Sequence, residues 1–145
     1  MGDNKKKWIA TAAHALIKRN GKYLILKRSV NEDYMPGVWD IPGGVINFRE
    51  SILKALYREI REECGLKVKQ KKLLFIYGNR PKQLKNNHHF QIIFLCDYIS
   101  GKVLLSRDHC DYRWISLSAM GDYNTISFLK AFFMDFKKNK SGLAN

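Results

Sequence analysis

Residues 44–66 read GVINFRESILKALYREIREECGL, and the interpretation of the whole chain starts from this stretch. On a helix, successive residues turn by about 100°, so Glu59, Glu62 and Glu63 fall on one face. Apolar residues form a second stripe about 100° around the same helix: Leu53, Leu56 and Ile60. The pattern therefore predicts a helix with one face in a core and another carrying concentrated negative charge.

This acidic face is unusual for the chain that carries it. The protein has 26 basic and 13 acidic residues, yet four of the acids lie between Glu50 and Glu63. Carboxylates at i, i+4 repel each other, and a hard divalent cation such as Mg²⁺ or Mn²⁺ would relieve that repulsion. The alternative is a solvated acidic face paired with Arg58 and Arg61, since charged triplets on helices are common.

The spacing of the stretch decides between these alternatives. It fits the pattern G-x5-E-x7-R-E-U-x-E-E-x-G-U, where U is aliphatic, at every fixed position from Gly44 to Leu66. This pattern resembles the Nudix box, the signature of hydrolases that cleave nucleoside diphosphates linked to another moiety. The resemblance implies a mixed α/β fold, a sheet with helices on both faces, and hydrolysis of a phosphoanhydride bond.

The resemblance also implies roles for individual residues of the box. Glu59, Glu62 and Glu63 would hold Mg²⁺ (or Mn²⁺) together with the carbonyl oxygen of Gly44. Glu59 could instead be the base that deprotonates the attacking water. Arg58 would orient the carboxylates by charge-assisted hydrogen bonds. Glu50 is expected to open the helix, where its charge suits the positive end of the helix dipole, and Gly65 to close it.

Candidates for substrate contact lie outside the box. By the resemblance, Lys27 and Arg28 at the end of a strand would reach substrate phosphate, although a solvated strand end is the alternative. Trp39 could stack on a base, but a buried core tryptophan is the more ordinary role. Asn124 is a further substrate-contact candidate, and it or Thr125 would cap the last helix.

One acid outside the box is a candidate metal ligand. In the branch of the family that cleaves oxidised dGTP, a metal-binding glutamate stands six residues before a tryptophan that resembles Trp114. Asp108 holds that place here. Aspartate is one methylene shorter, so contact through water is an alternative, and a solvated loop acid beside Arg107 is another. Asp111, in the same loop, is expected to be uninvolved.

Composition limits the class and surroundings of the protein. A length of 145 residues favours one domain, residues 1–145, with a substantial core. Three widely spaced cysteines, Cys64, Cys96 and Cys110, favour a reducing compartment. The run Trp8–Ile17 follows three lysines like a signal peptide, but His14 interrupts it, and no stretch is long enough to span a bilayer. These features predict a cytoplasmic protein; nothing in the sequence sets its oligomeric state.

The remaining elements follow from periodicity and turn residues. Strands are expected at 8–18, 22–27, 67–77, 89–99, 103–105 and 113–115, with a hairpin turn at Asn20-Gly21. A helix is expected at 126–136, a loop at 80–87 and a frayed end from residue 137. His88 and His89 are adjacent on a strand and point to opposite faces, which argues against one shared metal ion.

Three functions remain open on the sequence alone. The first is a nucleoside triphosphate pyrophosphohydrolase, which the small size favours mildly. The second is a related enzyme acting on ADP-ribose, a dinucleoside polyphosphate or a triphosphorylated RNA 5′ end. RNA would suit the net charge of +13. The third is a non-catalytic nucleotide or RNA-binding module, against which the intact box argues.

Overall fold

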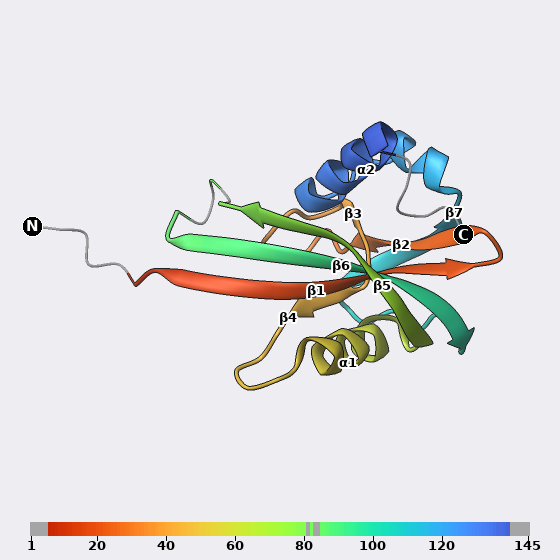
Figure 1. Cartoon of the computed structure of the whole chain (residues 1–145), viewed down its shortest axis with the longest axis horizontal. Helices are drawn as coiled ribbons and strands as arrows, with labels where there is room; N and C mark the ends of the chain where they lie inside the picture. Colours follow the sequence, from red (N-terminus) through yellow and green to blue (C-terminus); the bar gives the residue numbers. More distant parts are fainter. Residues whose placement is uncertain (1–5, 81, 83–84, 140–145) are drawn as a thin grey trace, which may run out of the picture.

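A seven-stranded mixed sheet forms the centre of the molecule, with a helix on each face (Figure 1). The computed structural model describes residues 6–80, 82 and 85–139. The strands are β1 (Trp8–Arg19), β2 (Lys22–Arg28), β3 (Trp39–Asp40), β4 (Gly43–Val45), β5 (Lys67–Asn79), β6 (Asn87–Ser100) and β7 (His109–Ile115). The helices are α1 (Ile52–Cys64), the short 3-10 helix η1 (Leu117–Asp122) and α2 (Ser127–Asn139). The expected α/β sandwich is confirmed.

Strand β1 organises the sheet, because its two edges meet different partners. Along one edge it runs parallel to β6 from Trp8 to Lys18. Along the other it pairs antiparallel first with β4, over Ala12 to His14, and then with β2, at Lys18 and Arg19. The sheet therefore splits between β4 and β2, and the segment that leads from β3 into β4 crosses this split.

The two faces of the sheet carry separate cores, as strand alternation requires. On the α1 side, Ala13, Ala15 and Ile17 of β1 pack with Leu56, Ile60 and Cys64 of the helix. On the α2 side, Leu16 of β1 packs among Ile93, Leu95, Phe128, Leu129 and Phe132. The sheet is thus buried on both faces through its middle, which explains the continuous apolar run in β6.

Helix α1 has well-defined ends, but its first residue and its buried stripe differ from the prediction. Ser51, not Glu50, caps it: the Ser51 hydroxyl accepts from the Lys54 N–H at 3.2 Å. Gly65 ends it in the left-handed region, φ +70°, as predicted. Leu53 is 41% exposed, so the buried stripe consists of Ala55, Leu56, Ile60 and Cys64.

Other predicted boundaries shift for identifiable reasons. Residues 103–105 form no strand; instead the Leu104 and Ser106 N–H groups donate to the carbonyls of Cys64 and Glu63 and satisfy the end of α1. Neither Asn124 nor Thr125 caps α2, because the first helical bonds are accepted by Ile126. The helix runs to Asn139, past the expected end at 136. Residues 81, 83, 84 and 140–145 of the predicted loop and frayed end lie outside the described residues.

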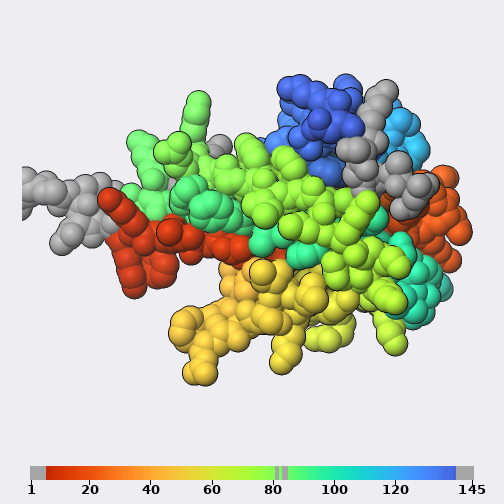
Figure 2. Space-filling view, in the orientation of Figure 1, coloured from red at the N-terminus to blue at the C-terminus, as the bar shows by residue number. Residues whose placement is uncertain are grey.

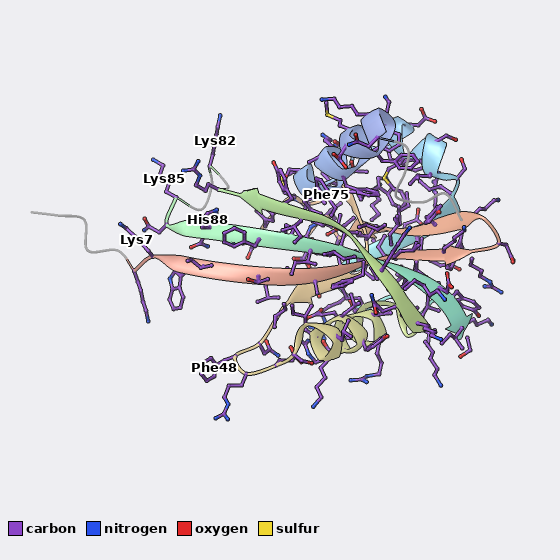
Figure 3. All side chains as sticks on the ribbon, in the orientation of Figure 1. Lys7, Phe48, Phe75, Lys82, Lys85 and His88 are labelled. Atoms are coloured by element: carbon purple, nitrogen blue, oxygen red, sulfur yellow. The ribbon has the colours of Figure 1, made fainter. Side chains whose placement is uncertain are left out.

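At one end of the molecule, β1, β5 and β6 reach past both helices (Figures 1 and 2). Figure 3 shows Lys7, Lys82 and Lys85 at this end, so part of the basic excess is concentrated there. Phe48, in the loop between β4 and α1, projects away from the molecule and is 95% exposed (Figure 3). No helix within the described residues is long and apolar enough to cross a membrane.

Candidate active site

A cleft of about 290 Å³ opens at the split in the sheet, and the box contributes one end of it. That end carries Gly43, Gly44 and Glu63, together with Asp108 from the loop before β7. His89 and Gln91 of β6 also line the cleft, with Ile126 and Phe128 from the α2 side. His14 of β1 lies between the two groups, against Gly43 and Phe128. The cleft therefore has both acidic and apolar side chains in its lining.

Arg58 contacts more partners than any other side chain of the box. Its Nε and Nη2 donate to the two carboxylate oxygens of Glu50 at 2.7 and 2.8 Å. Its Nη1 donates to Glu59 at 2.8 Å and to Glu62 at 3.2 Å, and Nη2 also reaches the carbonyl of Val45. The planar fork of arginine suits several such contacts at once. Arg58 thus links three carboxylates to β4.

Two of the box glutamates contact the backbone of β4. The Glu59 carboxylate lies against Gly44, where an added Cβ would come within 2.5–2.7 Å of its atoms. The Glu63 carboxylate accepts from the Gly43 N–H at 3.0 Å. Glycine is therefore needed at position 44 for this close approach, while Glu62 is the more exposed of the three glutamates.

The electrostatics at Glu63 indicate a site that is short of positive charge. Burial raises the pKa of Glu63 well above its ordinary value, and the nearby charges of Asp40, Glu59 and Asp108 raise it further. The hydrogen bond from Gly43 opposes this shift without cancelling it. A cation near Glu63 would stabilise the ionised carboxylates.

Four cleft residues were not singled out from the sequence: Glu32, Asp40, His14 and His109. Arg28 lies among them, within 3.6 Å of Glu32 and 3.5 Å of Asp40, and it also donates to the carbonyl of Tyr34. Asp108 lies beside Glu32, whose pKa is raised by burial and by that neighbour. No local signal marked these residues, because they come from four separate segments.

Buried histidines form part of the same cleft. His109 is 5% exposed, and neither ring nitrogen has a hydrogen-bond partner within the described residues. Burial lowers the pKa of both His109 and His14, although Asp40 acts in the opposite direction on each. Both rings are therefore favoured in the neutral form near pH 7.

The oxygen ligands available at the acidic end have the chemistry that Mg²⁺ or Mn²⁺ prefers. The raised pKa of Glu63 and the close fit of Glu59 on Gly44 are what such a site would show. Within residues 6–80, 82 and 85–139, no three histidine, cysteine or acidic side chains converge as a ready-made metal cluster. Arg58 and Gly43 hold the carboxylates in this arrangement.

Three predicted substrate contacts lie outside the cleft lining. Lys27 pairs with Trp39 and Asp111 across the sheet. Trp39 is 8% exposed, packed edge-on against Tyr123, as a core tryptophan would be. The Asn124 side chain accepts from Lys130 at 3.2 Å. Contact of these residues with a substrate stays a prediction, whereas Arg28 and Asp108 do line the cleft.

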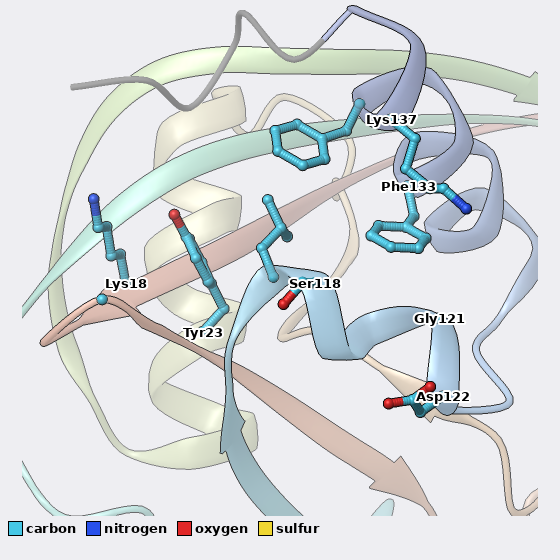
Figure 4. Close-up of a pocket in the computed structure, with 10 residues that line it drawn as sticks. Lys18, Tyr23, Ser118, Gly121, Asp122, Phe133 and Lys137 are labelled. Atoms are coloured by element: carbon cyan, nitrogen blue, oxygen red, sulfur yellow. The ribbon is translucent and has the colours of Figure 1, made fainter.

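A larger cavity, about 960 Å³, lies elsewhere, between β1, η1 and α2 (Figure 4). It is lined by apolar and aromatic groups such as Tyr23, Phe133 and Phe136, with Lys18, Lys137 and Asp122 at its edge. A single carboxylate beside two lysines is a poor site for a divalent cation. The chemistry is therefore assigned to the smaller cleft at the box.

Comparison with known proteins shows which family the chain belongs to. Residues 7–136 match the NUDIX domain. The chain is 32% identical over 109 residues to an ADP-ribose pyrophosphatase of Methanocaldococcus jannaschii, a match covering 75% of this chain but 63% of that protein. It is 31% identical over 117 residues to the nucleoside triphosphatase NudI of Klebsiella pneumoniae, covering 75% and 83%.

Solved structures show the same architecture. The MutT protein of Methanosarcina mazei Go1 superposes with a TM-score of 0.81 at 28% identity, covering 94% of this chain and 98% of that one. The E. coli ORF135 protein has a TM-score of 0.78 at 21% identity, which bears on the fold alone, and covers 99% and 98%. With its complete box and its match over most of its length, the chain belongs to the Nudix hydrolases, a family of pyrophosphohydrolase enzymes.

Proposed function

We propose that the protein is a nucleoside triphosphate pyrophosphohydrolase, which releases a nucleoside monophosphate and pyrophosphate. The observation that carries this proposal is the lining of the cleft, which combines the carboxylates of Glu63 and Asp108 with the apolar side chains of Ile126 and Phe128 within about 290 Å³. This volume lies at the lower end of the range for small-molecule sites. It suits one nucleoside better than a substrate with two bulky ends.

A divalent cation, Mg²⁺ or Mn²⁺, is the proposed cofactor. Glu59, Glu62 and Glu63 would hold it with the Gly44 carbonyl, and Asp108 would contribute from outside the box. When bound, it would neutralise charge on the phosphoryl oxygens and lower the pKa of the attacking water.

The chain's own residues would position the reacting groups. Arg58 donates to the Glu59 carboxylate at 2.8 Å and keeps it directed at β4. Glu59 is also a candidate to accept the proton of the attacking water. Arg28, which lines the cleft, would contact a phosphate if its partners Glu32 and Asp40 were displaced or bridged.

ADP-ribose is the second candidate substrate. The 32% identity to an ADP-ribose pyrophosphatase favours it, but that match covers 63% of the relative, against 83% for the nucleoside triphosphatase. A triphosphorylated RNA 5′ end is a third candidate, favoured by the net charge of +13 and the lysines at the end of the sheet.

A substrate panel with Mg²⁺ tests the proposal. Ribo- and deoxyribonucleoside triphosphates, ADP-ribose, diadenosine polyphosphates and a triphosphorylated RNA would be compared by initial rate, with products separated by anion-exchange chromatography. We expect a triphosphate to have the highest kcat/KM, with monophosphate and pyrophosphate as products. A tenfold preference for ADP-ribose, about 1.4 kcal/mol, would overturn it, as would diphosphate and orthophosphate products.

A further inference from the structure

The end of the sheet that reaches past both helices carries basic side chains and exposed rings that lie outside the cleft lining (Figures 1 and 2). We call this end the arm, and it consists of residues 6–11, 76–80, 82 and 85–90. Across it, β1 pairs with β6, and β6 pairs with β5. The Trp8 N–H donates to the Asn86 carbonyl at 2.9 Å, which ties the start of β1 to the turn before β6.

Charge is unevenly distributed along the chain, and the arm is built from stretches that contain no acids. Residues 4–31 and 64–96 together contain fifteen lysines and arginines and no aspartate or glutamate. Five of these basic residues belong to the arm and are exposed: Lys6, Lys7, Arg80, Lys82 and Lys85. None of the five is paired with a carboxylate within the part of the chain that the structure describes. The arm therefore presents positive charge without a counter-charge.

Aromatic rings lie beside these charges. Trp8 is 54% exposed, and the Lys6 Nζ lies 4.4 Å from the centroid of its ring. His88 and Phe90 are half-buried, with ring centroids 4.4 Å apart. Phe90 lies against Gly78, where an added Cβ would come within 3.3 Å of the ring. None of the three rings belongs to either of the two cores, so packing beneath a helix does not account for them.

The rings occupy both sides of the arm. Trp8 is the register partner of Asn87 in the parallel pair, so these two side chains share one face. His88 and Phe90 alternate with Asn87 along β6 and point to the other face. A ligand that contacts both sets of rings must pass around the ribbon of strands. A flexible chain can do this, whereas a flat lipid surface meets one face at a time.

Basic side chains beside exposed rings favour one class of partner. Lysine and arginine neutralise the phosphates of a nucleic acid, and aromatic rings stack on its unpaired bases. In a duplex the base faces are already stacked on each other, so the rings of the arm would be left unused. A single strand supplies one phosphate and one free base in every unit, which matches both features of the arm.

We propose that the arm binds single-stranded nucleic acid, with its five basic side chains on the phosphates and Trp8, His88 and Phe90 stacked on unpaired bases. The inference concerns binding outside the cleft and does not rest on the proposed hydrolysis of nucleoside triphosphates. It gives a role to part of the net charge of +13.

Binding is measured by fluorescence anisotropy with a labelled oligonucleotide of about 12 nucleotides, a length within the range that such surfaces cover. RNA and DNA versions carry a 5′-hydroxyl, and EDTA is present, so the probe has no phosphoanhydride bond for the cleft to cleave. We expect both probes to bind, with a plot of log Kobs against log salt concentration that has a slope of about −3, as for four or five neutralised phosphates.

Charge reversal tests the basic side chains of the arm. Lys82→Glu combined with Lys85→Glu should raise Kd tenfold or more at low salt and make the salt slope shallower. Lys130→Glu combined with Lys138→Glu, at exposed positions of α2, changes the net charge equally and should raise Kd much less. The kcat for nucleoside triphosphate should stay close to wild type in both, and melting temperatures would establish that each variant is folded.

Removal of single rings tests stacking. Trp8→Ala and Phe90→Leu should each raise Kd about fivefold or more, since stacking on one base accounts for that much affinity. Tyr112→Ala removes a ring that is 41% exposed on β7, away from the arm, and is the matched control. It should leave Kd unchanged.

The outcomes that would overturn the inference are distinct from those that bear on the proposed function. Equal effects of the two double charge reversals would show a response to net charge alone. Equal effects of Trp8→Ala and Tyr112→Ala would exclude stacking on the arm. Tighter binding of the duplex, or of vesicles containing phosphatidylserine, would assign the arm to another partner. A protein that hydrolyses nucleoside triphosphates but binds no oligonucleotide would lose this inference and keep the proposed function.

Discussion

The two faces of the sheet differ in how they contribute to one cleft. On the α1 face, Arg58, Glu59, Glu62 and Glu63 come from less than two turns of one helix, and Arg58 contacts Glu59 and Glu62 directly. On the α2 face, His14, Gln91 and Phe128 come from positions far apart in the chain and meet only in the folded sheet.

The two faces therefore depend on different parts of the sequence. Metal and phosphate chemistry needs charges at fixed separations, which one helix provides through its own repeat. The shape of the rest of the cleft depends instead on the packing of several elements. The α1 face should therefore be sensitive to single charge changes, and the α2 face to changes in shape and selectivity.

The largest expected effect is on the α1 face. Glu63→Gln should lower kcat by about three orders of magnitude, roughly 4 kcal/mol of transition-state stabilisation, if Glu63 holds a metal. Because burial and like charges raise its pKa, the neutral amide should leave the folded protein equally or more stable. Initial rates and urea unfolding check both parts. Asp135→Asn on α2 is the control, and full activity of Glu63→Gln would contradict the metal assignment.

Arg58→Lys should have the next largest effect. A lysine keeps the positive charge but cannot contact Glu50, Glu59 and Glu62 together, so the carboxylates lose their common partner. We expect kcat to fall about ten- to a hundredfold, with a lower melting temperature and a requirement for more Mg²⁺. Arg61→Lys, on the exposed side of the same helix, should change none of these values.

A smaller effect is expected in the loop that completes the acidic end. Asp108 lies in the cleft near Glu63, whereas Asp111 lies 3.9 Å from Arg113 and outside the cleft lining. Asp108→Asn should therefore lower turnover severalfold, up to about tenfold, and weaken the Mg²⁺ dependence. Asp111→Asn should do neither. Titration of activity with Mg²⁺ would show this, and equal, negligible changes would leave Asp108 without a metal role.

Glu50→Gln should lower kcat less than the substitutions above. Its main effect should be on how the free energy of unfolding depends on pH. Its hydrogen bonds with Arg58 lower the pKa of Glu50 from 4.5 to about 2. A lowered carboxyl pKa stabilises the folded state above the unfolded value, and this contribution is lost as the pH falls from about 4.5 toward 2. Urea unfolding should show a wild-type advantage at pH 7 that disappears by about pH 2. An advantage that is constant with pH would exclude the ion pair as its source.

Leu129→Ala should have the least effect on turnover. Leu129 is fully buried on the α2 face, so the cavity should cost about 2–5 kcal/mol of unfolding free energy. Below the lowered melting temperature, kcat per folded molecule with the best substrate of the panel should stay close to wild type. A lower kcat without a loss of folded protein would contradict the inference that the two faces of the sheet have separate roles.

The α1 face could be predicted from the sequence because the residues that form it lie close together along the chain. The box predicted Glu59 beside Gly44, where the structure has it, and strand periodicity predicted most of the sheet. Helix ends were less accurate: Ser51 is a better cap than Glu50, since its hydroxyl reaches the N–H three residues on. Residues 103–105 have strand-like composition, but the free carbonyls at the end of α1 bind them instead.

The rest of the cleft could not be predicted from spacing. Asp40, His14 and His109 are ordinary residues in their own segments, and they become buried neighbours only when β1, β3 and β7 assemble. Trp39 shows the converse. The sequence left a base-stacking role and a core role open for it, with the core role the more ordinary one, and β3 directs it into the core on the α2 side.

The parallel pairing of β1 with β6 has a consequence for how the protein is made. His14 and Gln91 are 77 positions apart, and contacts so distant along the chain form slowly because a long loop must close first. During synthesis, α1 with its glutamates leaves the ribosome well before β6 does. The nascent chain thus carries its acidic helix for some time without the strand that completes the cleft, and the cleft can form only after β6 and β7 have been synthesised.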